Sequence, residues 1–253
     1  MVALDSSATN KLGRDMYGIH RAAALAAFIF VLFLTVASAP AQTVTQDPRQ
    51  NQPGQFDFYV LSLSWSPSYC EAAQERYPNR KPNEQCGARP YSFVVHGLWP
   101  QYEKGFPEYC QQRAPKLDRA LISSMLDLMP SPRLIFNEWS KHGTCAGFAA
   151  RGYFEQIRKA RAAVKIPEAY LEAATARDVT PAEVEEAFIK ANPGLSTAAI
   201  SVTCDSRRLS EVRICLSKDD LQFRDCTELE RRSCKRPKVV MPAVRGGGLA
   251  TAQ

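Results

Sequence analysis

The sequence predicts an α+β fold in which a central antiparallel β-sheet packs against helices and is held by disulfides. Short apolar runs typical of strands occur near the beginning and the end of the folded part, and segments with a helical period lie between them. The chain also has eight cysteines, an even number, which in an exported protein predicts four disulfides. These cysteines are Cys70, Cys86, Cys110, Cys145, Cys204, Cys215, Cys226 and Cys234.

Residues 1–41 are typical of a secretory signal peptide. Basic residues precede the short apolar run Ala22–Val36, and Ala39-Pro40-Ala41 offers a cleavage site. The alternative is a permanent membrane anchor, because the run approaches the roughly 17–25 residues that span a bilayer. No charged stop-transfer cluster follows it, so we expect cleavage and a secreted or periplasmic protein that has no stable association with a membrane.

The composition fits one exported domain. The formal net charge of the chain is +6, and a modest basic excess suits a polyanionic partner without identifying one. Residues 42–55 are polar and predict a disordered lead-in. We expect the folded domain to cover residues 56–236 and a flexible tail to cover residues 237–253, whose glycine run has no period.

The first part of the domain predicts two strands. Phe56–Trp65 is rich in aromatic and branched residues, and Tyr91–His96 is a second strand, which Gly97 breaks. His96 is then left at a strand end, where functional side chains are often placed. Between the strands, Ser66–Arg89 is expected to be a long loop with a cysteine near each end.

The middle and last parts predict helices followed by strands. Ser131 and Pro132 can serve as N-cap and first residue of a central helix that extends to His142, and Thr180 begins a capping box. The other expected segments are a loop over Tyr102–Pro115, helices over Leu117–Met129, Tyr153–Val164 and Thr180–Ala191, and strands over Ala198–Thr203, Leu209–Leu216 and Leu221–Arg224.

The central helix carries the candidate chemistry in the segment FNEWSKHGTCAG. In a helix, Glu138 and His142 stand four residues apart on one face, and Lys141 lies beside them. The alternative is a surface helix with an ordinary charge pair. A second segment, FVVHGLWPQY, disfavours that alternative because it supplies His96, the other histidine that remains once His20 is removed with the leader.

Two imidazoles with unperturbed pKa values of about 6.5 can act as base and acid in one reaction. Such a pair needs no metal or other cofactor to cleave RNA: one ring takes the proton of the ribose 2′-OH, which attacks its own phosphate, and the other protonates the departing 5′-oxygen. DNA lacks the 2′-OH and cannot react in this way. The ammonium of Lys141 would offset charge on the phosphoryl oxygens, and Glu138 could donate a hydrogen bond or orient a neighbour.

The two segments HGLWPQ and EWSKHGTC resemble the signature segments of the ribonuclease T2 family, and the similarity of the cysteine pattern extends from Phe56 to Cys234. The resemblance implies a monomeric endoribonuclease that cleaves single-stranded RNA. It implies that His96 is the general acid and His142 the general base, that Glu138 and Lys141 stabilise the pentacovalent state, and that Trp99 helps to hold the substrate. Trp99 could equally be a core aromatic that fixes the strand end.

The family pattern also implies a disulfide pairing, which spacing alone leaves open. The implied pairs are Cys70–Cys86, Cys110–Cys145, Cys204–Cys234 and Cys215–Cys226. The second pair would tie the loop after His96 to the end of the central helix.

Two rival functions are weighed against this one. A zinc site of His96, His142 and Glu138 is disfavoured because the spacing is not H-E-x-x-H and because Lys141 would repel a cation. A zinc site of the cysteines is disfavoured because they lack the C-x-x-C spacing of ligand pairs. A secreted RNA-binding protein that has lost catalysis is made conceivable by Asn137, where many members have a histidine thought to contact phosphate.

Asn137 generates a first prediction. Asparagine can donate a hydrogen bond but carries no charge, so we expect retained activity with weaker phosphate binding. An Asn137→His variant is then expected to lower KM or to raise kcat in steady-state cleavage of RNA. If neither constant improves, the position is not a phosphate contact in this chain.

Overall fold

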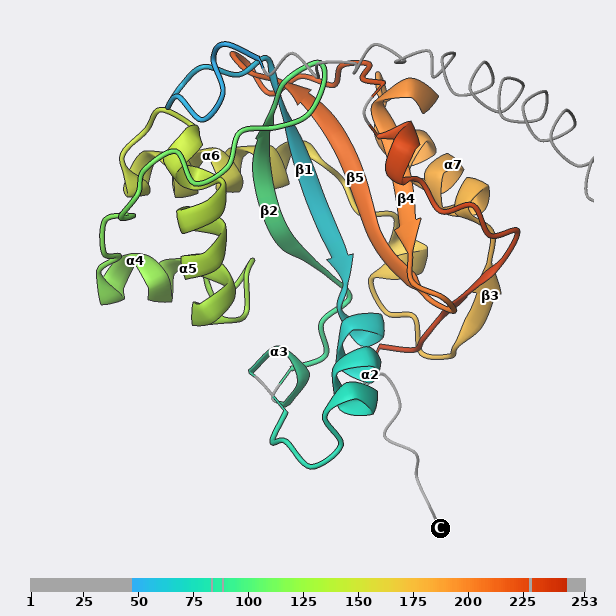
Figure 1. Cartoon of the computed structure of the whole chain (residues 1–253). Coiled ribbons are helices and arrows are strands. Elements are labelled where there is room, and N and C mark those ends of the chain that lie inside the picture. The colour runs from blue at the N-terminus through green and yellow to red at the C-terminus, as the bar shows by residue number, and fades with distance from the viewer. Residues whose placement is uncertain (1–46, 83, 88, 228, 245–253) are drawn as a thin grey trace, which may run out of the picture. The chain divides into compact units, whose positions relative to one another are not determined.

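A four-stranded antiparallel sheet forms the centre of the domain, with strand order β2-β1-β5-β4 (Figure 1). The structure is a computed structural model, and it describes residues 47–244 except 83, 88 and 228. The strands of the central sheet are β1 (Phe58–Trp65), β2 (Phe93–Gln101), β4 (Ile200–Cys204) and β5 (Leu209–Ser217). A smaller antiparallel sheet pairs β3 (Arg177–Val179) with β6 (Val239–Met241). The antiparallel sheet and the helices around it confirm the α+β prediction.

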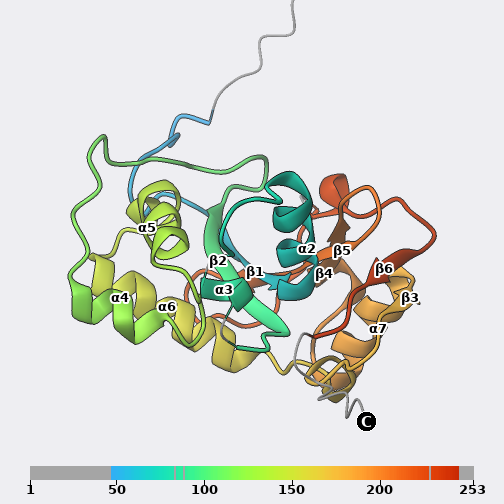
Figure 2. The same ribbon diagram turned by 90° about the horizontal axis from the view of Figure 1, so that it is seen from below.

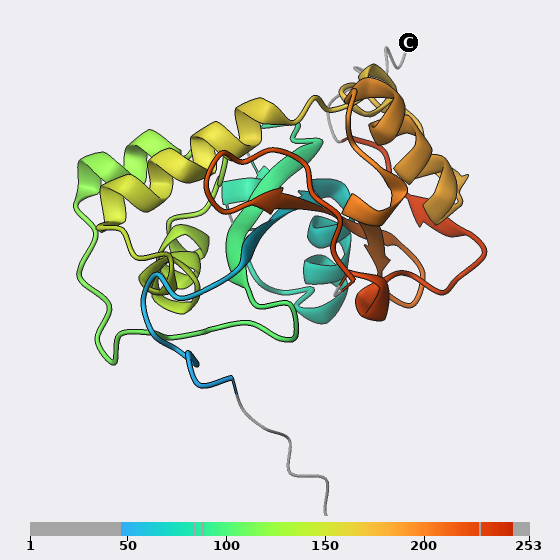
Figure 3. The same cartoon turned by 90° about the horizontal axis from the view of Figure 1, so that it is seen from above.

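Helices cover the sheet unequally. Viewed along the sheet, α6 and α7 lie on one side of it and α2 lies toward the other (Figures 2 and 3). Helix α5 packs on α6, because its Trp139 contacts Tyr153 and Phe154 in the large core. The helices are α2 (Ser66–Arg76), α3 (Glu84–Gly87), α4 (Arg119–Met125), α5 (Pro132–Lys141), α6 (Ala150–Ala163) and α7 (Pro181–Ala191), with 3-10 turns at Gly143–Cys145, Glu168–Tyr170, Thr197–Ala199 and Glu230–Arg232. In the described part of the chain no helix is long and apolar enough to span a membrane.

Strand β1 separates two apolar clusters because successive side chains of a strand point to opposite faces. Tyr59, Leu61 and Leu63 belong to the large core under the helices. Phe58 and Val60 belong to a small cluster on the other face, against which Trp99 packs. The second face is therefore only partly filled by apolar side chains, which leaves room for polar ones.

The helix starts predicted from the sequence are confirmed. The side chain of Ser131 accepts a hydrogen bond from the backbone N–H of Leu134, and Pro132 is the first residue of α5. Thr180 and Glu183 form both halves of a capping box at the start of α7. The helix expected over Leu117–Met129 is shorter, since α4 begins after the Asp118 cap and ends at Met125.

Three predicted segments were wrong. The expected loop Ser66–Arg89 contains α2 and α3, because Pro67 begins a helix rather than breaking one. Residues 47–54 of the expected disordered lead-in are bound to the domain, with Arg49 paired to Asp57 at 2.6 Å. Leu221–Arg224 forms no strand and is joined to β5 by an isolated bridge from Phe223. The signal peptide lies outside the described residues.

The expected tail over residues 237–253 is also wrong in its first part. Val239 and Met241 are buried in the large core, where β6 pairs with β3. A three-residue strand gives little periodic signal, and its burial comes from a partner distant in sequence. Residues 245–253 lie outside the described part.

The four disulfides join the pairs that the resemblance implied: Cys70–Cys86, Cys110–Cys145, Cys204–Cys234 and Cys215–Cys226.

The burial of β6 generates a prediction on stability. Met241→Ala should lower the free energy of unfolding by about 2–5 kcal/mol, because it empties a fully buried site. Val240→Ala is the matched control: its side chain is 38% exposed on the same strand, and a change within about 0.5 kcal/mol is expected. Equal denaturant midpoints for the two variants would contradict the packing of β6.

Candidate active site

A β-bulge in β2 turns His96 away from the large core. Ser62 pairs with Gly97 and Leu63 pairs with Val95, so His96 is the extra residue between them. Val95 and Leu98 both enter the large core although they are three residues apart, which a regular strand does not allow. The correction to the sequence prediction is that Gly97 does not break the strand, since β2 continues through it to Gln101.

On the open face of the sheet, His96 meets a carboxylate from a strand that is not its neighbour. Its Nδ1 lies 2.5 Å from Oε1 of Glu211 on β5, on the far side of β1. The β1 positions beneath this contact are Ser62 and Ser64. Two small side chains on the intervening strand therefore let the two outer side chains meet. Arg213 binds the other Glu211 oxygen at 2.6 Å.

The C-terminal end of α5 brings Glu138 and His142 to the same place. His142 is the C-cap of the helix, and its N–H binds the Glu138 carbonyl. Glu138 Oε2 accepts a 2.7 Å hydrogen bond from the Trp99 indole, and Oε1 lies 3.5 Å from His96 Nε2. The Trp99 ring centroid is 5.2 Å from that of His96 and 5.4 Å from that of His142. Trp99 thus contacts all three groups.

Gly97 permits this close approach. A Cβ at this position would lie 2.0 Å from Glu138 Oε2 and 2.4 Å from Trp99 Nε1. Neither atom can move away without breaking the hydrogen bond between the carboxylate and the indole.

The pair of His96 and Glu211 favours a protonated imidazole. Burial lowers the pKa of His96, but the hydrogen bond to Glu211 and the charges of Glu211 and Glu138 outweigh burial, so the pKa is raised above 6.5. Burial alone would raise the pKa of Glu211, but the stronger effects of His96 and Arg213 lower it to about 2. Glu211 is therefore ionised at neutral pH.

The surroundings of His142, at the end of α5, shift its pKa in the direction opposite to that of His96. Burial, with the nearby charges of Lys141 and His96, lowers the pKa of His142 to about 3, and its Nδ1 has no hydrogen-bond partner among the described residues. Burial raises the pKa of Glu138, although His96 and Trp99 oppose the shift. The pKa values of the two imidazoles are thus shifted in opposite directions, and so are those of the two carboxyl groups.

Lys141 lies at the edge of this cluster, beside the loop that follows β2. Its Nζ is 3.5 Å from Oε2 of Glu108 and 5.8 Å from the ring centroid of Phe106. The loop is fixed to the helix end, because the backbone N–H of Tyr109 donates to the Lys141 carbonyl and Cys110 is bonded to Cys145. Lys141 remains partly exposed, with its amine within reach of a ligand at the cluster.

The described residues contain no group of three or more His, Cys, Asp or Glu side chains arranged to hold a metal ion. Both ring nitrogens of His96 face carboxylates, Nδ1 that of Glu211 and Nε2 that of Glu138. The ring of His142 lies next to the indole of Trp99 on β2. The predicted general acid and general base thus both lie next to the Trp99 ring.

A scan against protein-family models matches residues 56–226 to the Ribonuclease T2 family. The chain belongs to the ribonuclease T2 family. It is 32% identical over 206 residues to a ribonuclease of Aeromonas hydrophila, with 78% of this chain and 90% of that protein aligned. A probable ribonuclease of Haemophilus influenzae is 37% identical over 127 residues, which is 47% of each chain, so the match spans about half of that protein.

A solved ribonuclease structure also matches this chain. The crystal structure of RNase NT in complex with 5′-AMP has a TM-score of 0.54 and 28% sequence identity, and the match covers 68% of this chain and 90% of that one. The family supports endoribonuclease activity, with RNA as the substrate.

In this T2 ribonuclease, the side chains of His96, Trp99, Glu138 and His142 lie close together, with Lys141 at their edge, and their catalytic roles stay predictions. Asn137 is exposed beside His96 in a groove, where its contact with phosphate stays a prediction. Sequence reasoning missed Glu211 and Arg213. The available signal was the alternation of leucine and serine in β1, which indicates a strand face with room for polar neighbours.

The close contact at Gly97 generates a prediction. Gly97→Ala should lower kcat/KM on single-stranded RNA by about 10²-fold, because displacing a catalytic group by about 1 Å has effects of this size. Gly87→Ala is the control, since a Cβ there meets no atom within 4 Å. Near-normal kcat/KM in Gly97→Ala would show that the carboxylate and indole need not touch.

Proposed function

We propose that this chain is an exported, monomeric endoribonuclease that cleaves single-stranded RNA through a 2′,3′-cyclic phosphate, with an imidazole acid and an imidazole base and without a metal. The observation that carries the proposal is that His96 and His142 lie against the same Trp99 ring with pKa values shifted in opposite directions. Four disulfides support export, because they persist in oxidising compartments.

His96 acts as the general acid. Its raised pKa favours the protonated ring, and Nδ1 is bound by Glu211. Nε2 stands 3.5 Å from Glu138, which is too long for a strong hydrogen bond. The Nε2 proton is therefore available to the departing 5′-oxygen.

His142 acts as the general base. Its lowered pKa keeps the buried ring neutral, so that one ring nitrogen can accept the proton of the 2′-OH. A phosphodiester bound beside His142 brings a negative charge, which raises the pKa of the ring toward the working pH. The ring thus becomes a better base when the substrate arrives.

Lys141 and Glu138 stabilise the pentacovalent phosphorus. Lys141 supplies positive charge from the partly exposed end of α5. Because its pKa is raised, Glu138 can be protonated and donate a hydrogen bond to a phosphoryl oxygen, while Trp99 holds its other oxygen. Trp99 therefore serves both as a positioning residue and as part of the substrate wall.

Incubation of the purified mature protein with single-stranded RNA tests the proposal. We expect a 2′,3′-cyclic phosphate product, activity that survives a strong chelator, and a fall in kcat of about 10²- to 10⁴-fold in His96→Ala and in His142→Ala. Intact RNA would support a binding protein instead. Loss of activity in the chelator would overturn the metal-free mechanism, and near-normal turnover of either variant would remove that histidine from it.

The pair of His96 and Glu211 generates a prediction on pH dependence. The acid must be protonated, so activity is lost as pH rises through the pKa of His96. Glu211→Gln removes the charge that raises this pKa, and the alkaline limb of kcat/KM should move to lower pH by about 1–3 units. Glu185→Gln, at a carboxylate that lines a different cavity, should leave the profile unchanged. An unmoved alkaline limb in Glu211→Gln would contradict the pairing.

A further inference from the structure

A groove of about 790 Å³ has His96 in its wall and is otherwise lined mainly by α2, α3 and the segment between them, and by residues of α5 and its cap. Its volume lies within the roughly 300–1,000 Å³ typical of ligand sites. His96 is part of its wall, but His142 and Lys141 are not. The groove therefore includes the proposed acid but not the proposed base.

The charge of this groove is largely positive. Arg76, Arg80, Lys81 and Arg133 line it and are exposed, whereas Glu84 is the one carboxylate among its described lining residues. The two acidic side chains of α2 face elsewhere: Glu71 binds Arg208 at 3.0 Å, and Glu75 binds Arg207 at 2.5 Å. Helix α2 thus keeps its carboxylates in ion pairs near β5 and presents a cation to the groove.

Two tyrosines accompany these cations. Tyr69 and Tyr77 line the groove with 45% and 46% of their surface exposed. The Arg80 guanidinium lies 4.5 Å from the Tyr77 ring centroid. Exposed aromatic rings and guanidinium planes among cations form the usual surface for unpaired bases and their phosphates.

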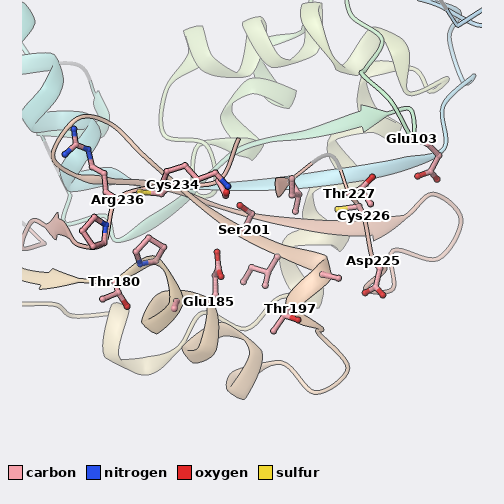
Figure 4. Close-up of a pocket in the computed structure, with 18 residues that line it drawn as sticks. Glu103, Thr180, Glu185, Thr197, Ser201, Asp225, Cys226, Thr227, Cys234 and Arg236 are labelled. Atoms are coloured by element: carbon pink, nitrogen blue, oxygen red, sulfur yellow. The ribbon is translucent and has the colours of Figure 1, made fainter. Parts of the chain in front are cut away.

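A second hollow differs from this groove in the charge of its lining residues. It has a volume of about 980 Å³ and lies between the start of α7, the edge of β4 and the last cysteines (Figure 4). Glu103, Glu185 and Asp225 line it together with Lys235 and Arg236. This balance of charge does not favour a polyanion, and none of the catalytic residues is part of its wall.

The geometry points to the α2 groove as a binding site for the RNA nucleotides that follow the leaving nucleoside on the 3′ side of the scissile phosphate. The inference rests on the proposed function, because His96 protonates the 5′-oxygen of the nucleoside that leaves. The nucleotides after that nucleoside extend from His96 into the groove. Arg76, Arg80 and Arg133 bind their phosphates, and Tyr69 and Tyr77 stack with their bases.

Substrates with one cleavable position test this site. A DNA oligonucleotide that contains a single ribonucleotide can be cut at that residue only. One substrate carries several deoxynucleotides on the 3′ side of the ribonucleotide, a second carries them on the 5′ side, and a dinucleoside monophosphate carries neither extension. We expect the wild-type enzyme to show its lowest KM with the 3′-extended substrate.

Substitutions in the groove should raise KM for the 3′-extended substrate and leave KM for the other two substrates unchanged. Tyr77→Ala should raise KM for the 3′-extended substrate by about tenfold or more. Arg76→Ser combined with Arg80→Ser should raise it too, and should reduce the slope of log kcat/KM against log salt by about 0.7 for each lost phosphate contact. Arg236→Ser, an exposed arginine of the second hollow, is the matched control and should change neither constant.

The outcomes separate this inference from the catalytic proposal. If the wild-type enzyme fails to cleave even the dinucleoside monophosphate, the proposed function is wrong. If it cleaves all three substrates with equal KM, or if the groove variants change KM for the 5′-extended substrate as much as for the 3′-extended one, the groove does not hold the leaving strand. Because the altered side chains are exposed, thermal unfolding of the variants should match that of the wild type.

Discussion

The bulge at His96 is the constraint on which the active site depends. With regular pairing, a strand that buried Val95 in the core would expose Leu98 on the opposite face. The extra residue shifts the alternation of side chains along β2 by one position. Val95 and Leu98 therefore both remain in the core, while His96 and Trp99 lie on the open face. The hydrophobic energy of burying Leu98 therefore also holds the catalytic strand in register.

On the open face, residues of the same type have different surroundings and therefore different pKa values. The residues concerned are the two glutamates, Glu138 and Glu211, and the two histidines, His96 and His142. Glu211 is held ionised by His96 and Arg213, whereas Glu138 faces an indole and gains protons more readily. In the described part of the chain, Nδ1 of His142 has no hydrogen-bond partner, whereas Nδ1 of His96 is bound by Glu211. The fold thus shifts the pKa values of like groups in opposite directions before any substrate is bound.

Local chemistry made much of this predictable from the sequence. The cap at Ser131, the capping box at Thr180 and the strand at β1 depend on residues close together in the chain, and the two motif segments pointed to the family and to the proposed catalytic residues. Glu211 could not be predicted, because its contact with His96 crosses β1 and depends on sheet order and register. The same reason applies to β6, whose burial comes from a partner strand distant in sequence. Helix α2 was missed because its proline, Pro67, and its polar residues are also typical of loops.

The disulfide between Cys110 and Cys145 has a consequence for when the enzyme can be assembled. It joins the loop that carries Phe106 and Glu108 to the turn directly after His142. Such bonds form in oxidising surroundings and are rare where thiols are kept reduced. One wall of the active site is therefore closed by a covalent step that needs oxidising surroundings, so that a copy whose thiols are still reduced lacks this closure.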